Sequence, residues 1–288
     1  SSMQYGSIMK ILAQLGCPSD FKATIFTCNN TELFNMLFNV KNEYYLEKIY
    51  ATKYSKEIES EFTEEDMHKF QNNMAYLLTG VDNILIKEEI PREKIDNYYQ
   101  YTIKENKQYF IQKNFNIKRL ETKNEIYTNP KYYNNIIEDK NILEFMQIRA
   151  NLEKDDTFKV EFIDENKNTN LTIYSLDIDK LNKAYEYLKN NQIKYSKYEY
   201  NNIEGTITTK KDEIIFTTIP YDESWEIKVD GKKVIPFKAF NSFIAIKTEG
   251  GTHNISFKYK NDFTAPIIIS ISSLVITLTF YVIKKKKK

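Results

Sequence analysis

Side chains that could bind a carbohydrate gather in the stretch PYDESWEIKVDG and at the start of a later alternating segment. Tyr221 and Trp225 offer flat aromatic faces, which can stack on the apolar face of a sugar ring as they do on other flat apolar groups. Asp230 and His253 carry groups that hydrogen-bond to hydroxyls. These four residues are candidate glycan-binding residues.

The same residues also have a structural interpretation, which the spacing favours for the tryptophan. Trp225 alternates with Ile227 and Val229, the pattern of a buried strand face, so a core position is the simpler expectation. Asp230 most simply serves a tight turn with the following glycine, and His253 most simply packs or hydrogen-bonds at a strand start.

Two amides on a predicted helix, Gln71 and Asn72, complete the glycan-binding candidates because amide donors and acceptors suit hydroxyl-rich ligands. The alternative is an ordinary exposed amide pair in an Asn-rich chain. Nearby His68 has no second His or Cys beside it, so we expect a surface or capping residue and no metal ligand.

Motifs that mark stand-alone catalysis are absent from the sequence. It contains no HExxH, CxxC, GxGxxG, P-loop or GxSxG pattern, and adjacent acids such as Asp222 and Glu223 are typical of solvated turns. We therefore expect no catalytic residue, metal site or cofactor on this chain. Cys17 and Cys28 are the only cysteines, which leaves either one bridge or two free thiols.

The charge balance excludes an electrostatic drive toward nucleic acid. Lys plus Arg total 41 and Asp plus Glu total 40, so the formal net charge is +1. Apolar residues make up 41% of the chain, which is enough for the part outside the predicted membrane segment to fold around a hydrophobic core.

These residues must be positioned by two kinds of element. Residues 1–95 are expected to be mostly helical, with Met67, Phe70, Met74 and Leu77 on one helix face that ends at Gly80. After Pro91, short runs rich in Tyr, Ile, Phe and Val predict strands, interrupted by one amphipathic helix that follows residue 177. The predicted class is α+β, mainly β, with a β-sandwich or jelly-roll-like domain.

The clearest local pattern is a hairpin. Residues 225–229 alternate apolar and polar side chains before Asp230 and Gly231, which supply a two-residue turn. Residues 253–259 alternate in the same way and predict a last strand.

A transmembrane helix is predicted near the end of the chain. Ala265–Ile283 holds nineteen residues without a charge, and a helix of that length spans about 28 Å at ~1.5 Å per residue. The five lysines that follow, Lys284–Lys288, are expected to stay cytoplasmic, which places residues 1–262 outside the cytoplasm. Because Ser1–Gln14 has no signal-peptide pattern, we expect membrane spans upstream in the parent protein.

Four stretches resemble the bacterial YfhO family: LFNVKNEYYL, HKFQNNMAYLLTG, IEGTITTKKDEIIFTTIPYDESWEIKVDGKKV and GGTHNISFKYKNDF. The pattern that carries the resemblance consists of Ile219, Pro220, Tyr221, Trp225, Val229, Asp230, Gly231, His253 and Tyr259. Ser224 departs from the glycine that often precedes the tryptophan in the family, and Lys41 and Asn42 depart from its usual "vKY".

The resemblance implies a polytopic membrane glycosyltransferase of the GT-C type that uses a polyprenyl-phosphate-linked sugar and glycosylates a cell-surface polymer such as lipoteichoic acid. It places the catalytic carboxylate in an earlier loop, outside this chain. This part would position the acceptor, with the bilayer, a cell-surface glycopolymer or lipid-linked glycan, and the upstream membrane domain as partners.

The sequence therefore predicts four parts: a helical subdomain (1–95), a sandwich-like domain (96–262), a transmembrane helix (263–283) and a lysine tail (284–288). The alternative function is a noncatalytic, membrane-tethered glycan-binding or scaffold module. A secreted hydrolase is a third alternative, disfavoured by the missing nucleophile and metal motifs.

Overall fold

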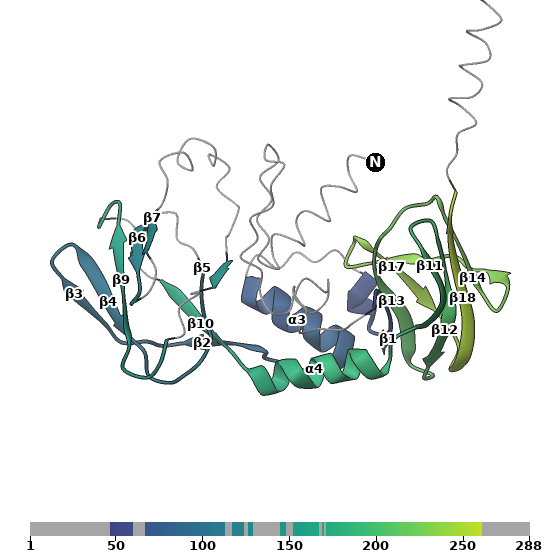
Figure 1. Cartoon of the computed structure of the whole chain (residues 1–288), viewed down its shortest axis with the longest axis horizontal. Coiled ribbons are helices and arrows are strands. Elements are labelled where there is room, and N and C mark those ends of the chain that lie inside the picture. Colours follow the sequence, from purple (N-terminus) through teal and green to yellow (C-terminus); the bar gives the residue numbers. More distant parts are fainter. Residues whose placement is uncertain are drawn as a thin grey trace, which may run out of the picture.

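The computed structural model describes residues 47–59, 67–112, 117–123, 126–128, 145–147, 152–166, 169 and 171–260 (Figure 1). Within these ranges the chain forms four antiparallel sheets and two α-helices, which confirms the mainly β class. The jelly-roll-like connectivity and the predicted domain boundaries stay predictions.

Two sheets build the C-terminal sandwich. The inner sheet has the order β1 (Ile49–Lys53), β13 (Glu213–Pro220), β17 (Phe243–Lys247), β16 (Phe237–Ala239). The outer sheet has the order β11 (Lys194–Glu199), β12 (Asn202–Thr209), β18 (Gly251–Tyr259), β14 (Trp225–Val229), β15 (Lys232–Lys233).

The other two sheets build the N-terminal sandwich. Its inner sheet has the order β2 (Leu85–Glu88), β10 (Thr172–Leu176), β5 (Tyr109–Gln112), β8 (Phe145–Gln147). Its outer sheet has the order β3 (Arg92–Ile95), β4 (Tyr98–Thr102), β9 (Thr157–Phe162), β6 (Ile117–Glu121), β7 (Ile126–Thr128).

Helices α3 (Met67–Thr79) and α4 (Ile178–Asn190) lie between the two sandwiches (Figure 1). Their apolar faces share one buried cluster with Phe110 and Tyr174 of the N-terminal inner sheet and with Phe216 and Phe243 of the C-terminal inner sheet. Both inner sheets are therefore covered on both faces, by their partner sheet and by the helices.

Each sandwich also has a core of its own. In the C-terminal sandwich, Ile215 and Ile246 of the inner sheet share a buried cluster with Ile227 and Phe257 of the outer sheet. The alternation predicted for residues 225–229 is confirmed, because Ile227 and Val229 are buried and Lys228 is not.

The two predicted helices are confirmed, and their ends have local causes. Asp177 caps α4 by accepting a hydrogen bond from the Lys180 amide (3.0 Å). Gly80 follows α3 with a φ of 78°, a left-handed conformation that glycine adopts without strain. A short 3₁₀ turn, η1 (Lys56–Glu59), precedes α3.

Several expectations fall outside the described residues: the helical structure predicted within residues 1–46, the two cysteines and the segment Ala265–Ile283. Among the described residues, no helix is both long and apolar enough to span a bilayer. Strands β1, β2 and β3, which the sequence did not predict, accompany α3 in the described part of residues 1–95.

Candidate functional site

The turn that carries Asp230 is a two-residue hairpin turn, as predicted. Asp230 and Gly231 have φ values of 51° and 76°, and Val229 pairs with Lys232 across the turn. Positive φ at both central residues is the geometry of a type I′ turn, which joins twisted strands without splaying them.

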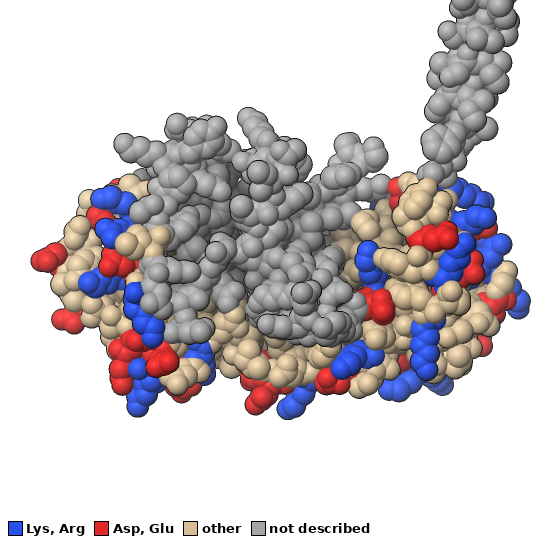
Figure 2. All heavy atoms as spheres, viewed as in Figure 1, with Lys and Arg blue, Asp and Glu red and all other residues tan. Residues whose placement is uncertain are grey.

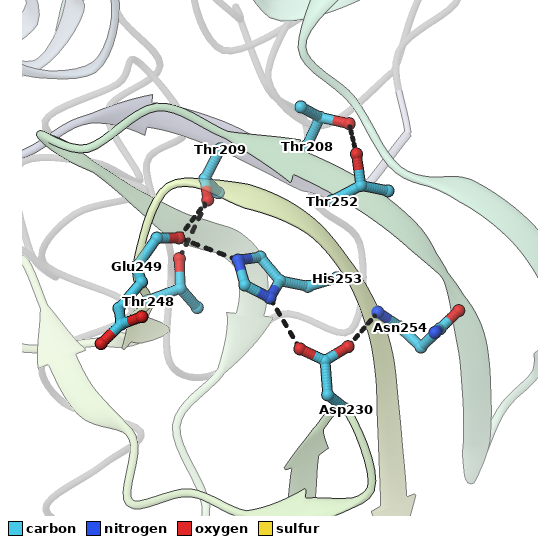
Figure 3. Close-up of polar contacts among 8 residues, drawn as sticks. All are labelled: Thr208, Thr209, Asp230, Thr248, Glu249, Thr252, His253 and Asn254. Atoms are coloured by element: carbon cyan, nitrogen blue, oxygen red, sulfur yellow. Dashed lines mark hydrogen bonds and ion pairs between the residues drawn. The ribbon is translucent and has the colours of Figure 1, made fainter.

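His253 and Asp230, two of the glycan-binding candidates, contact each other at this turn (Figure 3). His253 Nδ1 lies 2.8 Å from Asp230 Oδ2, and its Nε2 lies 2.8 Å from the carbonyl oxygen of Glu249. The other carboxylate oxygen accepts a hydrogen bond from the Asn254 amide (2.9 Å). Both ring nitrogens thus face acceptors, an arrangement that only the doubly protonated imidazolium satisfies.

The electrostatics agree with this geometry. The Asp230 carboxylate raises the pKa of His253, and the Glu249 carbonyl adds to the effect. In return, the His253 ring lowers the pKa of Asp230, with help from the Asn254 amide. The pair is therefore a charged clasp between the β14–β15 turn and β18, and the imidazole has no free nitrogen to act as a base.

Threonine hydroxyls fasten the same end of the sandwich. Thr208 and Thr252 join β12 to β18 (2.9 Å), and Thr209 Oγ1 donates to the Glu249 carbonyl (2.9 Å) (Figure 3). That carbonyl also contacts the histidine ring, so the segment before β18 is fixed from two sides.

Trp225 and Tyr221 lie at the opposite end of β14. Trp225 is half-buried and packs edge-on against Phe257 and Tyr259, with ring centroids 6.4 and 5.1 Å away. Tyr221 is half-buried too, and the Lys238 ammonium lies 5.1 Å from its ring centroid. The tryptophan thus closes the edge of the core and keeps part of its ring exposed.

Five residue steps of extended chain lead from Trp225 to Asp230, about 17 Å at ~3.3 Å per residue. The structure therefore places two of the four candidates of this region at each end of β14 and does not bring all four together; of these four, His253 and Asp230 contact each other. Next to Tyr221, the Asp222 carboxylate accepts a hydrogen bond from the Ser224 backbone amide (2.7 Å), and this bond lowers the pKa of Asp222.

Gln71 and Asn72 lie elsewhere, on α3 between the sandwiches. Gln71 is fully buried. The Asn72 amide pairs with the backbone of Leu85, accepting from its N–H (2.9 Å) and donating to its carbonyl (2.8 Å), as a neighbouring strand would. This structural function of Asn72 has no signal in the sequence, because the partner lies on β2.

Within the described residues, no group of three His, Cys, Asp or Glu side chains could hold a metal ion. Several titratable groups there form ion pairs at the surface, such as Lys123 with Asp156 (2.6 Å) and Lys118 with Glu161 (2.6 Å). Such exposed pairs contribute little to stability.

Comparisons with known proteins agree on one family. The family described as "Bacterial membrane protein YfhO" matches residues 78–270, which include α4 and every strand from β2 to β18. A curated relative, "Uncharacterized protein YfhO" of Bacillus subtilis (strain 168), is 30% identical over 118 residues, covering 41% of this chain and 14% of the relative. No solved structure matches. Because the family match extends over more than half of the chain, this protein belongs to the YfhO family of bacterial membrane proteins.

Proposed function

We propose that this chain is the acceptor-positioning, extracytoplasmic part of a YfhO-type polytopic membrane glycosyltransferase. In this proposal the enzyme is of the GT-C type, takes a sugar from a polyprenyl-phosphate donor and modifies a cell-surface polymer such as lipoteichoic acid. Family membership is the observation that carries the proposal, since the match includes every strand from β2 to β18 and every residue of the IPY…W…VDG…H…Y pattern.

The geometry of the candidate residues supports a binding function and a separate catalytic part. Asp230 and His253 are held by each other and by backbone groups, so neither is poised for proton transfer. Tyr221 and Trp225 keep partly exposed rings at one end of the sandwich, where a sugar could stack. The curated relative extends well beyond the matched region, which leaves room for catalysis elsewhere in the protein.

Positioning by itself can accelerate a transfer reaction. A domain that holds a long polymer near a membrane-embedded active site raises its effective concentration there, even when each contact is weak. The proposal therefore requires modest polymer binding by this region and no transfer activity of its own.

The test compares the full-length parent protein with residues 1–262 in a sugar-transfer assay that uses a polyprenyl-phosphate sugar and isolated cell-surface polymer. We expect transfer by the parent alone. In the parent, Tyr221→Ala should raise KM for the polymer and leave kcat unchanged, because it removes a contact made equally before and during reaction.

Tyr98→Ala, on the outer face of the N-terminal sandwich, is the matched control and should leave both constants unchanged. Transfer by residues 1–262 alone would overturn the proposal. Polymer binding without transfer by the intact parent would favour the noncatalytic tether.

A further inference from the structure

The chain leaves the C-terminal sandwich between two loops that hold it tightly. The Tyr259 amide donates to the Asn201 carbonyl in the β11–β12 turn (2.8 Å), and the Lys260 amide donates to the Ser224 carbonyl in the β13–β14 loop (2.9 Å). We call these two loops and residues 258–260 the exit end. Because backbone bonds join them, the loops stay beside the point where the chain departs (Figure 1).

Four aromatic side chains with exposed or partly exposed rings lie at the exit end. Tyr200, in the β11–β12 turn, is 85% exposed, and Tyr198 on the strand before it is 50% exposed. Tyr221 and Trp225 lie in or beside the other loop with partly exposed rings. Tyrosine and tryptophan combine an apolar ring with a polar group, and they are enriched where proteins meet the headgroups of a bilayer.

The length of the connection places this end near a membrane. Five residue steps lead from Lys260 to Ala265, where the predicted transmembrane segment begins, and they span at most about 18 Å at ~3.6 Å per residue. The headgroup layer takes up about 5–8 Å of that distance, from the difference between the full bilayer and its hydrocarbon core. The exit end is thus confined to the neighbourhood of the lipid headgroups.

Charge at the exit end is balanced and does not select a polyanion. Lys260 pairs with Glu226, and Lys197 pairs with Glu199 (3.3 Å). Blue and red spheres are intermixed over the C-terminal sandwich on the right of Figure 2. The aromatic rings, and not net charge, distinguish this surface.

We propose that the exit end is a membrane-contacting surface that rests in the headgroup layer of the bilayer to which the chain is anchored, with Tyr200 at its apex. Strand β18 then rises away from the membrane, and the six residue steps from Tyr259 to His253 place the His253–Asp230 clasp about 20 Å farther out, at ~3.3 Å per residue. The proposal rests on the predicted membrane segment and holds whether or not the parent protein transfers sugar.

Trp225, the only tryptophan of the chain, makes the test direct. The full chain is reconstituted in phosphatidylcholine vesicles that contain a headgroup-nitroxide lipid, which quenches nearby indoles. Three proteins are compared: the unaltered chain, a Trp225→Phe/Tyr200→Trp variant and a Trp225→Phe/Lys211→Trp control. Lys211 is exposed in the β12–β13 turn, at the opposite end of the sandwich.

We expect at least threefold stronger quenching of the indole at position 200 than at position 211, and intermediate quenching of the partly buried Trp225. Adding phosphatidylglycerol should change these ratios by less than twofold, because basic and acidic side chains are balanced at this end. Quenching of Trp225 in the unaltered chain still tests the proposal if the Trp225→Phe substitution impairs folding of the other two proteins.

Equal quenching at positions 200 and 211 would overturn the proposal, as would a chain that fails to float with the vesicles. Quenching of the indole at position 200 by acrylamide, measured with vesicles and with soluble polymer, distinguishes membrane contact from glycan binding. If the vesicles do not shield position 200 from acrylamide, the exit end does not contact the membrane, whether or not soluble cell-surface polymer shields that position.

Discussion

At the residue scale, the two nitrogens of His253 face a carboxylate and a carbonyl, so the ring is satisfied only when it is protonated. The raised pKa of His253 adds stability that is complete below its unfolded value of about 6.5 and is lost as pH rises through the folded value. The lowered pKa of Asp230 adds stability that is present above about pH 3.9 and is lost as pH falls through the folded value. The clasp is therefore strongest between about pH 4 and 6.5.

We predict that the denaturation midpoint, followed by Trp225 fluorescence, falls from pH 6 to pH 9 in the unaltered chain and falls less in a His253→Gln variant. The chain has only two histidines, so His68→Gln is a matched control that should keep the full pH dependence. A His253→Gln curve parallel to that of the unaltered chain would show that the clasp does not form.

A second residue-scale prediction concerns Asn72, whose amide satisfies both backbone groups of Leu85. Asn72→Ala leaves that N–H and carbonyl without their partner, and we expect a loss of about 1–3 kcal/mol in the free energy of unfolding. Urea denaturation measures it.

Asn73→Ala, one residue farther along the same helix and exposed, has the same change in helix propensity and is the control. Equal midpoints for the two variants would assign Asn72 no structural function and would return it to the glycan-binding candidates.

At the element scale, burial separates the inner strands from the outer ones. Residues 213–219 of β13 and residues 243–246 of β17 are buried without interruption, whereas β12 and β9 alternate between buried and more exposed positions. Strands covered on both faces read as continuous apolar runs, and strands covered on one face alternate. The sequence therefore predicted the buried faces of two outer strands, β14 and β18, from their alternation, and it did not predict β1 or β17.

Gly205 provides the element-scale prediction. A Cβ at this position of β12 would lie 2.5 Å from the Lys194 carbonyl oxygen on β11, and a backbone atom cannot move away as a flexible side chain can. We expect Gly205→Ala to cost about 1–3 kcal/mol and to loosen β11, measured as faster amide exchange on residues 194–199.

Thr206→Ala, on the solvent side of the same strand, controls for the loss of local strand propensity. Unchanged exchange in Gly205→Ala would show that β11 does not approach β12 this closely.

At the scale of the whole molecule, the cluster around α3 and α4 makes the two sandwiches one packed unit. Phe110 of the N-terminal inner sheet and Phe216 of the C-terminal inner sheet belong to this cluster, and both are fully buried. A substitution that destabilises one sandwich should therefore also lower the stability of the other.

We predict that Phe110→Ala, which removes a buried aromatic ring at a cost of about 3–5 kcal/mol, lowers the unfolding midpoint reported by Trp225 in the opposite sandwich. The control Gln100→Ala changes a half-exposed side chain of the same sandwich and should leave that midpoint in place. If Phe110→Ala leaves the unfolding midpoint reported by Trp225 unchanged, the two sandwiches unfold independently.

The sequence by itself determined the local features of this protein: the amphipathic helices, the alternation of β14 and β18, the hairpin turn at Asp230 and Gly231, and the motif of its family. Each depends on neighbours within a few residues, where side-chain period and backbone preference act directly. The pairing of β1 with β13, the burial of both faces of the inner sheets, and the contact of His253 with Asp230 depended on the tertiary structure. Periodicity tells which face of an element is apolar, but only the assembled packing decides what covers that face.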